Sequence, residues 1–193
     1  MRRTFILTLL FFGVLLSSHA QTQSPEALCG TSILKDPAVQ EAWARLLAKN
    51  PDLMKLHSKR LASVNLQVGV LDTFWTYNFE GSGSFEETAA ELRATGSLSY
   101  VWVALDQLEN LNIDSTVVAA ILQALESKTP GASRDSAKGI LQLERQYFGD
   151  PPNINSSFVK GQGDGRTHFL VYDIKDGWNG TGGYVAGYFF DVD

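Results

Sequence analysis

The middle of the sequence reads Ser97-Leu98-Ser99-Tyr100-Val101-Trp102-Val103-Ala104-Leu105. Aromatic and β-branched residues are frequent in this run, and side chains in a strand alternate between its two faces. One face would carry Leu98, Tyr100 and Trp102, and the other Val101, Val103 and Leu105. The run predicts a strand over residues 97–105. We expect its aromatic side chains in the core rather than on a binding surface, because one face of a sheet normally packs.

The residues before this run have the same period of two. Leu66, Val68 and Val70 alternate with polar or small residues, and residues 74–79 are rich in aromatic strand formers. A turn is expected at residues 81–84, followed by a strand near residues 88–94 that hinges at Thr95-Gly96. The alanines and glutamates of residues 88–94 suit a helical turn equally well. Together these runs predict an antiparallel β region over residues 65–110.

Two helices and two strands are expected in residues 111–193. Asp114 or Ser115 caps the first helix, whose apolar residues recur every three or four positions as far as Leu125. The second is predicted from about Ser136 to Phe148, with Gly149 as its C-terminal residue. Strands are predicted at residues 168–172 and 184–190. This part of the chain therefore has an α/β pattern.

Residues 21–64 are predicted to form a helical leader. Asp36-Pro37 is typical of a helix start, with a capping carboxylate followed by proline at the first helical position. Asn50-Pro51 ends that helix, and a shorter helical stretch is expected around residues 53–60. The fold class predicted for the chain is α+β, an antiparallel β-sheet region followed by helices.

Residues 1–20 have the pattern of a signal peptide. Arg2 and Arg3 precede an uncharged apolar run, and Ser18-His19-Ala20 offers small residues at the cleavage positions. The apolar run is shorter than the roughly 20 residues that a transmembrane helix needs. We therefore expect a secreted protein, periplasmic or extracellular, with no membrane association after cleavage; an uncleaved anchor is the alternative.

The charge balance argues against nucleic acid as a partner. The formal net charge is −5 at pH 7, and removal of Arg2 and Arg3 with the signal peptide makes the chain more acidic. Nucleic-acid binding depends on basic residues that neutralise phosphates, and the sequence has no basic stripe. The same reasoning disfavours an anionic membrane surface.

The sequence contains no recognisable catalytic or metal-binding motif. After signal cleavage the histidines are His57 and His168, far apart in the sequence, and no His-Glu-x-x-His run exists. His168 is expected to be a strand-end residue with a satisfied hydrogen bond. Cys29, the single cysteine, is expected to be an unpaired thiol, without a neighbouring histidine or basic residue to lower its pKa. We assign no catalytic residue and no metal ligand.

Acidic residues cluster near the end of the sequence, at positions Asp164, Asp173, Asp176, Asp191 and Asp193. Oxygen-rich loops of this kind can bind calcium, but their spacing does not match the twelve-residue calcium loop. Asp173 and Asp176 can also be read as a general acid and base pair. Asp-x-x-Asp-Gly is an ordinary turn composition, so we favour solvated turn residues over both readings.

Several segments resemble one family of secreted enzymes. They are Val70-x-Asp72-Thr73-x-Trp75, residues 91–96 and 100–103, residues 147–152, residues 168–177, and Gly183-Tyr184-Val185-Ala186-Gly187-Tyr188-Phe189. In this order they resemble the amino-terminal half of secreted bacterial zinc metallopeptidases of the hyicolysin-like and immune-inhibitor-A-like types. The resemblance covers about residues 66–193.

The resemblance implies that residues 111–193 form an incomplete, zincin-like N-terminal lobe of a peptidase. In such families the His-Glu-x-x-His helix follows a strand like residues 184–190. Because the sequence stops at Asp193 directly behind that strand-like run, we expect an N-terminal fragment truncated before the motif, a scaffold that is inactive as it stands. Zinc belongs to the resembled family, and no ligand for it can be carried over.

The resemblance also implies a protein or peptide substrate for the full-length protein. In zinc peptidases an edge strand pairs with the substrate backbone, which is β-augmentation. The candidate substrate-binding residues are Tyr184, Val185, Ala186, Gly187, Tyr188 and Phe189. Two alternatives stay open: a non-enzymatic secreted domain that binds a protein, peptide or glycan, and a glycan-processing enzyme with two carboxylates roughly 5 to 9 Å apart.

Overall fold

A computed structural model describes residues 27–51, 66–81, 83–110, 112–131, 133, 135–150 and 165–188. The predicted signal peptide and the short helix expected at residues 53–60 lie outside this part of the chain. Helices and strands are mixed along the chain, which confirms the α+β prediction. None of the helices in the described ranges has the length and apolar character that crossing a membrane requires.

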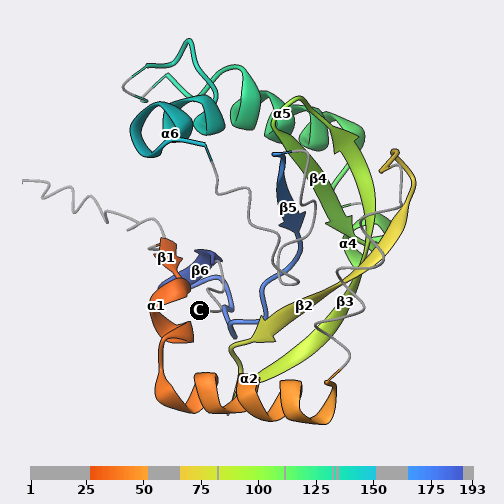
Figure 1. Cartoon of the computed structure of the whole chain (residues 1–193), viewed down its shortest axis with the longest axis vertical. Helices are drawn as coiled ribbons and strands as arrows, with labels where there is room; N and C mark the ends of the chain where they lie inside the picture. The colour runs from red at the N-terminus through yellow and green to blue at the C-terminus, as the bar shows by residue number, and fades with distance from the viewer. Residues whose placement is uncertain are drawn as a thin grey trace, which may run out of the picture.

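The main element is a curved four-stranded sheet (Figure 1). Its order is β2 (Leu71–Asn78), β3 (Ser84–Thr95), β4 (Ser99–Ala104) and β5 (Thr167–Val171). The first three strands pair antiparallel, as predicted, and the strand reading of residues 88–94 is confirmed. Strand β5 pairs parallel to β4, a direction that the sequence pattern did not indicate.

Strand β4 lies at the centre of the core because both of its faces are covered. Val101 and Val103 pack against Val118, Leu125 and Leu141, which belong to helices α5 (Ser115–Glu126) and α6 (Ile140–Phe148). On the opposite face Tyr100 and Trp102 pack with Ala90, Leu92 and Phe74. The Trp102 side chain is 0% exposed. The prediction that the aromatic residues of this run are core residues is therefore confirmed.

Several predicted boundaries were wrong by a few residues. Residues 66–70 contain a turn at Val68-Gly69 instead of a strand, since Gly69 has a φ of 95° that only glycine adopts readily. Leu105 opens the short helix α4 (Leu105–Glu109) and does not extend β4. The second predicted helix begins at Ile140 and not at Ser136, and β5 ends at Val171 before Tyr172.

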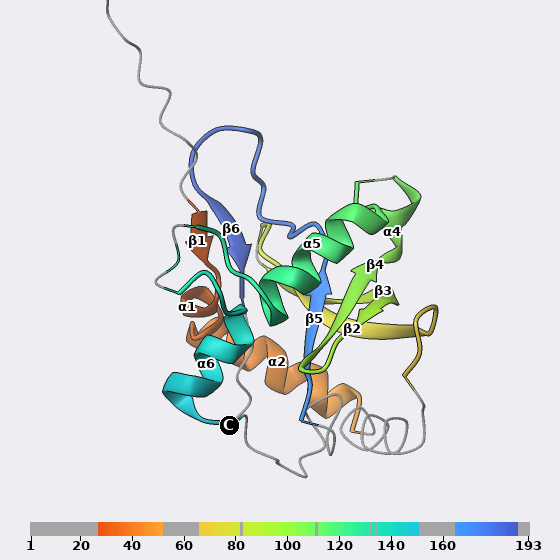
Figure 2. The same ribbon diagram turned by 90° about the horizontal axis from the view of Figure 1, so that it is seen from above.

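The helices that cover the sheet begin and end as the sequence suggests. Helix α5 (Ser115–Glu126) is capped by Asp114, whose carboxylate accepts a hydrogen bond from the Val117 amide at 2.9 Å. Helix α6 (Ile140–Phe148) ends at Gly149, which has a φ of 83°. Figure 2 shows both helices on the same side of β4 and β5.

The N-terminal elements pack against the opposite end of the sheet. They are β1 (Ala27–Cys29), α1 (Thr31–Leu34) and α2 (Pro37–Lys49), which is the helix predicted from the Asp36 cap. Leu34 and Val39 form a third core cluster with Tyr77 of β2. Strand β1 was not predicted. The division of the chain into residues 21–64, 65–110 and 111–193 stays a prediction.

One carboxylate ties α5 to the start of β4. Glu126 accepts hydrogen bonds from the Ser97 amide and hydroxyl, the Leu98 amide and the Ser99 hydroxyl, at 2.7 to 2.9 Å. Gly96 leaves room for this carboxylate, because a Cβ at that position would lie 1.8 Å from Glu126 Oε1. Partial burial by itself raises the pKa of Glu126, but the hydrogen bonds from Ser99, Leu98 and Ser97 outweigh it and hold the pKa below its ordinary value.

We expect Glu126→Gln to lower the free energy of unfolding by about 1 to 3 kcal/mol at pH 7, because several charge-assisted hydrogen bonds are lost. A carboxylate whose pKa is depressed in the folded state stabilises the fold above the unfolded pKa, about 4.3, and that contribution disappears as the pH falls through the lower folded pKa. The difference between variant and wild type, measured by urea denaturation, should therefore shrink towards zero below about pH 4. Glu144→Gln, at an exposed α6 position, is the control and should match the wild type throughout.

Candidate functional site

Strand β6 (Tyr184–Gly187) contains most of the candidate substrate-binding residues. It pairs in parallel with β1 in a separate two-stranded sheet. Val185 is buried, Ala186 is exposed, and the Tyr184 ring packs against Trp178 with centroids 5.5 Å apart. Phe189 lies outside the described residues. The predicted strand is thus present at residues 184–187, and its role in substrate binding stays a prediction.

Asp176 holds the loop before β6 in place. Its carboxylate accepts hydrogen bonds from the Val185 amide at 2.5 Å and from the Trp178 amide at 2.9 Å. The side chain is half-buried, whereas Asp173 is exposed. Asp176 is therefore a turn-stabilising residue committed to backbone amides. Asp164, Asp191 and Asp193 lie outside the described residues, so the calcium reading stays untested.

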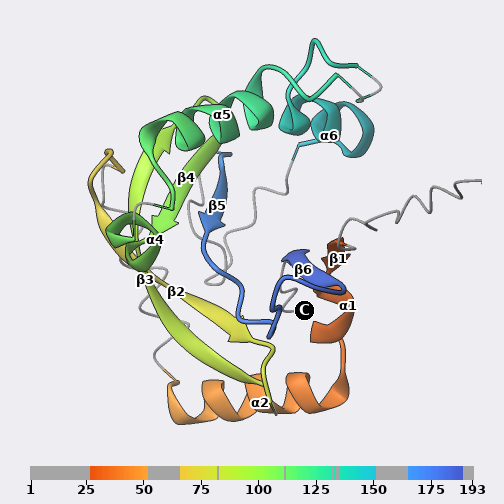
Figure 3. The same cartoon turned by 180° about the vertical axis from the view of Figure 1, so that it is seen from behind.

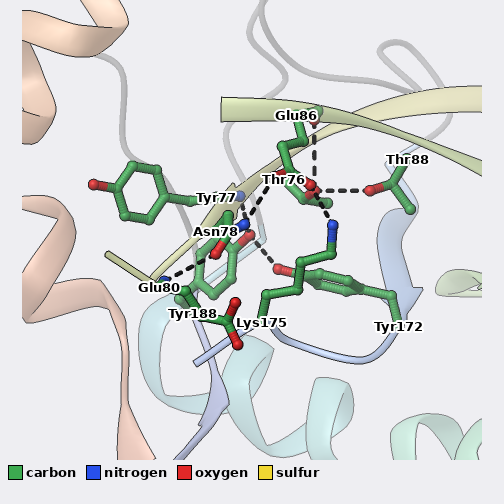
Figure 4. Close-up of polar contacts among 9 residues, drawn as sticks. All are labelled: Thr76, Tyr77, Asn78, Glu80, Glu86, Thr88, Tyr172, Lys175 and Tyr188. Carbon is green, nitrogen blue, oxygen red and sulfur yellow. Dashed lines mark hydrogen bonds and ion pairs between the residues drawn. The ribbon is translucent and has the colours of Figure 1, made fainter. Parts of the chain in front are cut away.

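A pair of tyrosine hydroxyls joins the strand to the main sheet. Tyr188 follows β6, and its hydroxyl is hydrogen-bonded to that of Tyr172 (Figure 4). The Tyr77 amide of β2 donates to the same Tyr188 oxygen at 2.7 Å. Burial raises the pKa of both phenols, and the hydrogen bond to Tyr188 raises that of Tyr172 further. Both hydroxyls therefore stay protonated at neutral pH.

A pocket of about 260 Å³ lies beside Tyr172. It is bounded by β2 and β3, by the start of α4 and by the segment after β5, with Thr76, Glu86, Thr88, Asp106 and Tyr172 among its lining residues. The Thr76 and Thr88 hydroxyls are hydrogen-bonded at 2.7 Å. The pocket is slightly smaller than those that hold drug-sized ligands, which begin at about 300 Å³.

Glu86 and Lys175 form an ion pair across the rim of this pocket, with Nζ and Oε2 2.5 Å apart. The hydrogen bond from Lys175 lowers the pKa of Glu86, with a smaller effect from Asn78, and the same pairing raises the pKa of Lys175. A general acid or base works best with a pKa near the operating pH. The pKa of each group is shifted further from neutral pH, so the pair is unsuited to proton transfer. It instead holds the segment after β5 against β3.

The structure describes one of the two histidines that remain after the predicted signal cleavage. His57 lies outside the described residues, and His168 is the second residue of β5, where its Nδ1 accepts a hydrogen bond from Trp102 Nε1 at 3.0 Å. The prediction of a hydrogen-bonded strand-end histidine is confirmed. Within the described ranges, no three His, Cys, Asp or Glu side chains lie close enough together to hold a metal ion. The donors present there therefore do not fit zinc.

Cys29 differs from its prediction in one respect. It is an exposed free thiol, as expected. The sequence offered no basic neighbour that would lower its pKa, yet hydrogen bonds from the Thr31 side chain and backbone amide do lower it. A hydroxyl two residues away along a turn therefore has an effect that a search for charged neighbours misses.

Sequence reasoning did not foresee the contacts that hold β6. Tyr188 was named as a candidate substrate-binding residue and Tyr172 as the end of a predicted strand, whereas Glu86 lies outside the strand predicted near residues 88–94. The signal that was present is an alternation: Thr76, Glu86 and Thr88 share one face of the β2–β3 pair by register. Nothing in the sequence indicates that the segment at residues 172–188 crosses to that face.

Comparison with known proteins identifies a sequence relative of this chain. Neutral metalloprotease ShpI from Staphylococcus hyicus is 30% identical over 145 residues, which are 75% of this chain and 28% of that protein. The chain therefore spans little more than a quarter of the length of this relative. No family model and no solved structure matches the chain. The similarity supports a metallopeptidase-like relationship.

We expect Tyr188→Phe to lower the free energy of unfolding by about 1 to 3 kcal/mol, because the Tyr77 amide and the Tyr172 hydroxyl both lose a partner in a buried region. The measurement is urea denaturation followed by tryptophan fluorescence. Tyr147→Phe removes a hydroxyl from an exposed α6 side chain and should leave the midpoint unchanged. Equal stability of the two variants would show that the Tyr188 hydroxyl does not hold the segment.

Proposed function

We propose that this chain is the amino-terminal part of a secreted, zinc-dependent endopeptidase of the hyicolysin-like type. The observation that carries the proposal is the 30% identity to a neutral metalloprotease over three quarters of the chain. In this proposal residues 27–188 provide a scaffold and a candidate substrate strand, and the hydrolytic centre lies in sequence beyond Asp193. The chain by itself is then inactive.

The geometry of β6 supports a role in holding an extended peptide. Strand addition needs a backbone edge that keeps its position, because the hydrogen bonds of the bound peptide go to backbone groups. Asp176 accepts a hydrogen bond from the Val185 amide. Tyr188, the residue directly after β6, is held against β2 by the hydrogen bond that its hydroxyl accepts. A protein or peptide substrate is the ligand class that such a strand would recognise.

Zinc would not be held by the residues that the structure describes. His168 already accepts a hydrogen bond through Nδ1, and Asp176 is committed to two amides. When bound elsewhere in such an enzyme, zinc activates water for amide hydrolysis. No step of that chemistry is assigned to residues of this chain. The alternative of a non-enzymatic binding domain gains no support from the comparison with known proteins.

The test is to read the coding sequence that follows codon 193 and to express the extended protein. We expect an in-frame His-Glu-x-x-His and casein cleavage that a zinc chelator abolishes, because that motif supplies two imidazoles and the general base. Replacement of the motif glutamate by glutamine should abolish cleavage and retain zinc. Residues 21–193 alone should show no chelator-sensitive cleavage. A genuine stop codon after Asp193, or chelator-sensitive cleavage by residues 21–193, would refute the proposal.

A further inference from the structure

One edge of β6 is occupied by another segment of the same chain. On the outer edge β1 runs parallel to it, with Ala27 opposite Tyr184, Leu28 opposite Val185 and Cys29 opposite Gly187. The Gly30 amide extends the pairing by donating to the Gly187 carbonyl at 2.9 Å. Figures 1, 2 and 3 agree that β1 lies on the side of β6 away from β5.

A side chain also occupies one backbone amide of β6. The Val185 amide donates to Asp176, so it cannot donate to a peptide. A peptide that adds to a strand needs free backbone N–H and C=O groups along one edge. A peptide that pairs with the outer edge must therefore replace β1.

We propose that residues 27–30 are a built-in, replaceable occupant of the β6 edge, and that this edge accepts an extended peptide lying parallel to β6 with glycine at the position of Gly30. The identification of this peptide as part of a substrate rests on the function proposed above. The replacement of β1 by another strand is independent of that function.

The requirement for glycine follows from three close neighbours. A Cβ on Gly30 would lie 2.7 Å from Val185 Cγ1, 3.0 Å from the Phe79 ring and 3.2 Å from Tyr188 Cβ. The first distance is shorter than real Cβ contacts. Val185 is buried and held by Asp176, and Tyr188 is held by its hydroxyl, so neither can easily yield. A strand with any larger residue here is expected to bind poorly.

The occupant is attached through the elements that follow it. Leu28 is 42% exposed and Cys29 is exposed, so β1 binds mainly through its backbone. Leu34 and Val39 of the next two helices are buried against Tyr77. A strand on so short a tether competes at an effective concentration in the millimolar range. The unmodified chain should therefore exclude free peptides at micromolar concentration.

The test uses a fluorescein-labelled peptide of residues 24–31 that carries Cys29→Ser, and fluorescence anisotropy with the full chain. Gly30→Val in the chain displaces β1, so this variant should bind the peptide at least about tenfold more tightly than the wild type, a difference of about 1.4 kcal/mol. Gly131→Val, where a Cβ meets no atom within 4 Å, is the matched control and should behave like the wild type. The same peptide with Gly30→Val should bind to none of them.

Gly30→Ala introduces the same clash with a smaller side chain and decides the question if the valine variant does not fold. Folding of each variant is checked by its urea midpoint. A folded variant that binds the peptide no better than the wild type overturns the proposal, as does equal binding of the glycine and valine peptides. The readout needs no peptidase activity. If the peptide binds as expected but the downstream sequence has no zinc motif, the proposed function is refuted and the proposed strand exchange stands.

Discussion

The hydroxyl of Tyr188 is the contact on which the arrangement of the candidate site depends. Strand β2 is an edge of the four-stranded sheet, so amides on its outer side need partners other than a strand. Tyr188 accepts from the Tyr77 amide and the Lys175 carbonyl accepts from the Phe79 amide at 2.7 Å. The same two contacts hold the segment that carries β6. The same contacts therefore cover the edge of the sheet and fix the position of the candidate strand.

Local patterns predicted much of the fold. Alternation in residues 97–105 identified a strand whose aromatic residues are buried, and Asp36 and Asp114 marked two helix starts through their capping carboxylates. Direction and partner of β5 were beyond such patterns, because a parallel pair joins segments far apart in sequence. Strand β1 has only three residues and no periodicity. The turn at Gly69 escaped because Val68 and Val70 mimic a strand when only hydrophobicity is read.

The candidate site was less predictable than the fold, since its properties arise from contacts between distant segments. Asp173 and Asp176 belong to one Asp-x-x-Asp-Gly motif, yet one is exposed and the other holds two amides. The sequence pattern cannot distinguish the two aspartates, because their different environments depend on where the loop contacts β6. Glu86 and Lys175 likewise shift each other's pKa across 89 sequence positions. An ionisable group can be recognised in sequence, whereas its partner must be found in space.

A strand that covers an edge can be merely protective, and the packing of β1 bears on whether it is more than that. Edge strands are commonly covered to prevent unwanted pairing. A permanent cover would gain stability by burying side chains, at about 25 cal/mol for each Å² of apolar surface. Leu28 of β1 is 42% exposed, while Leu34 on the tether is 2% exposed. The attachment of β1 is thus stabilised mainly by the helices that follow it. The close neighbours of Gly30 select which strand can pair with β6. This is expected of a strand that another strand can replace.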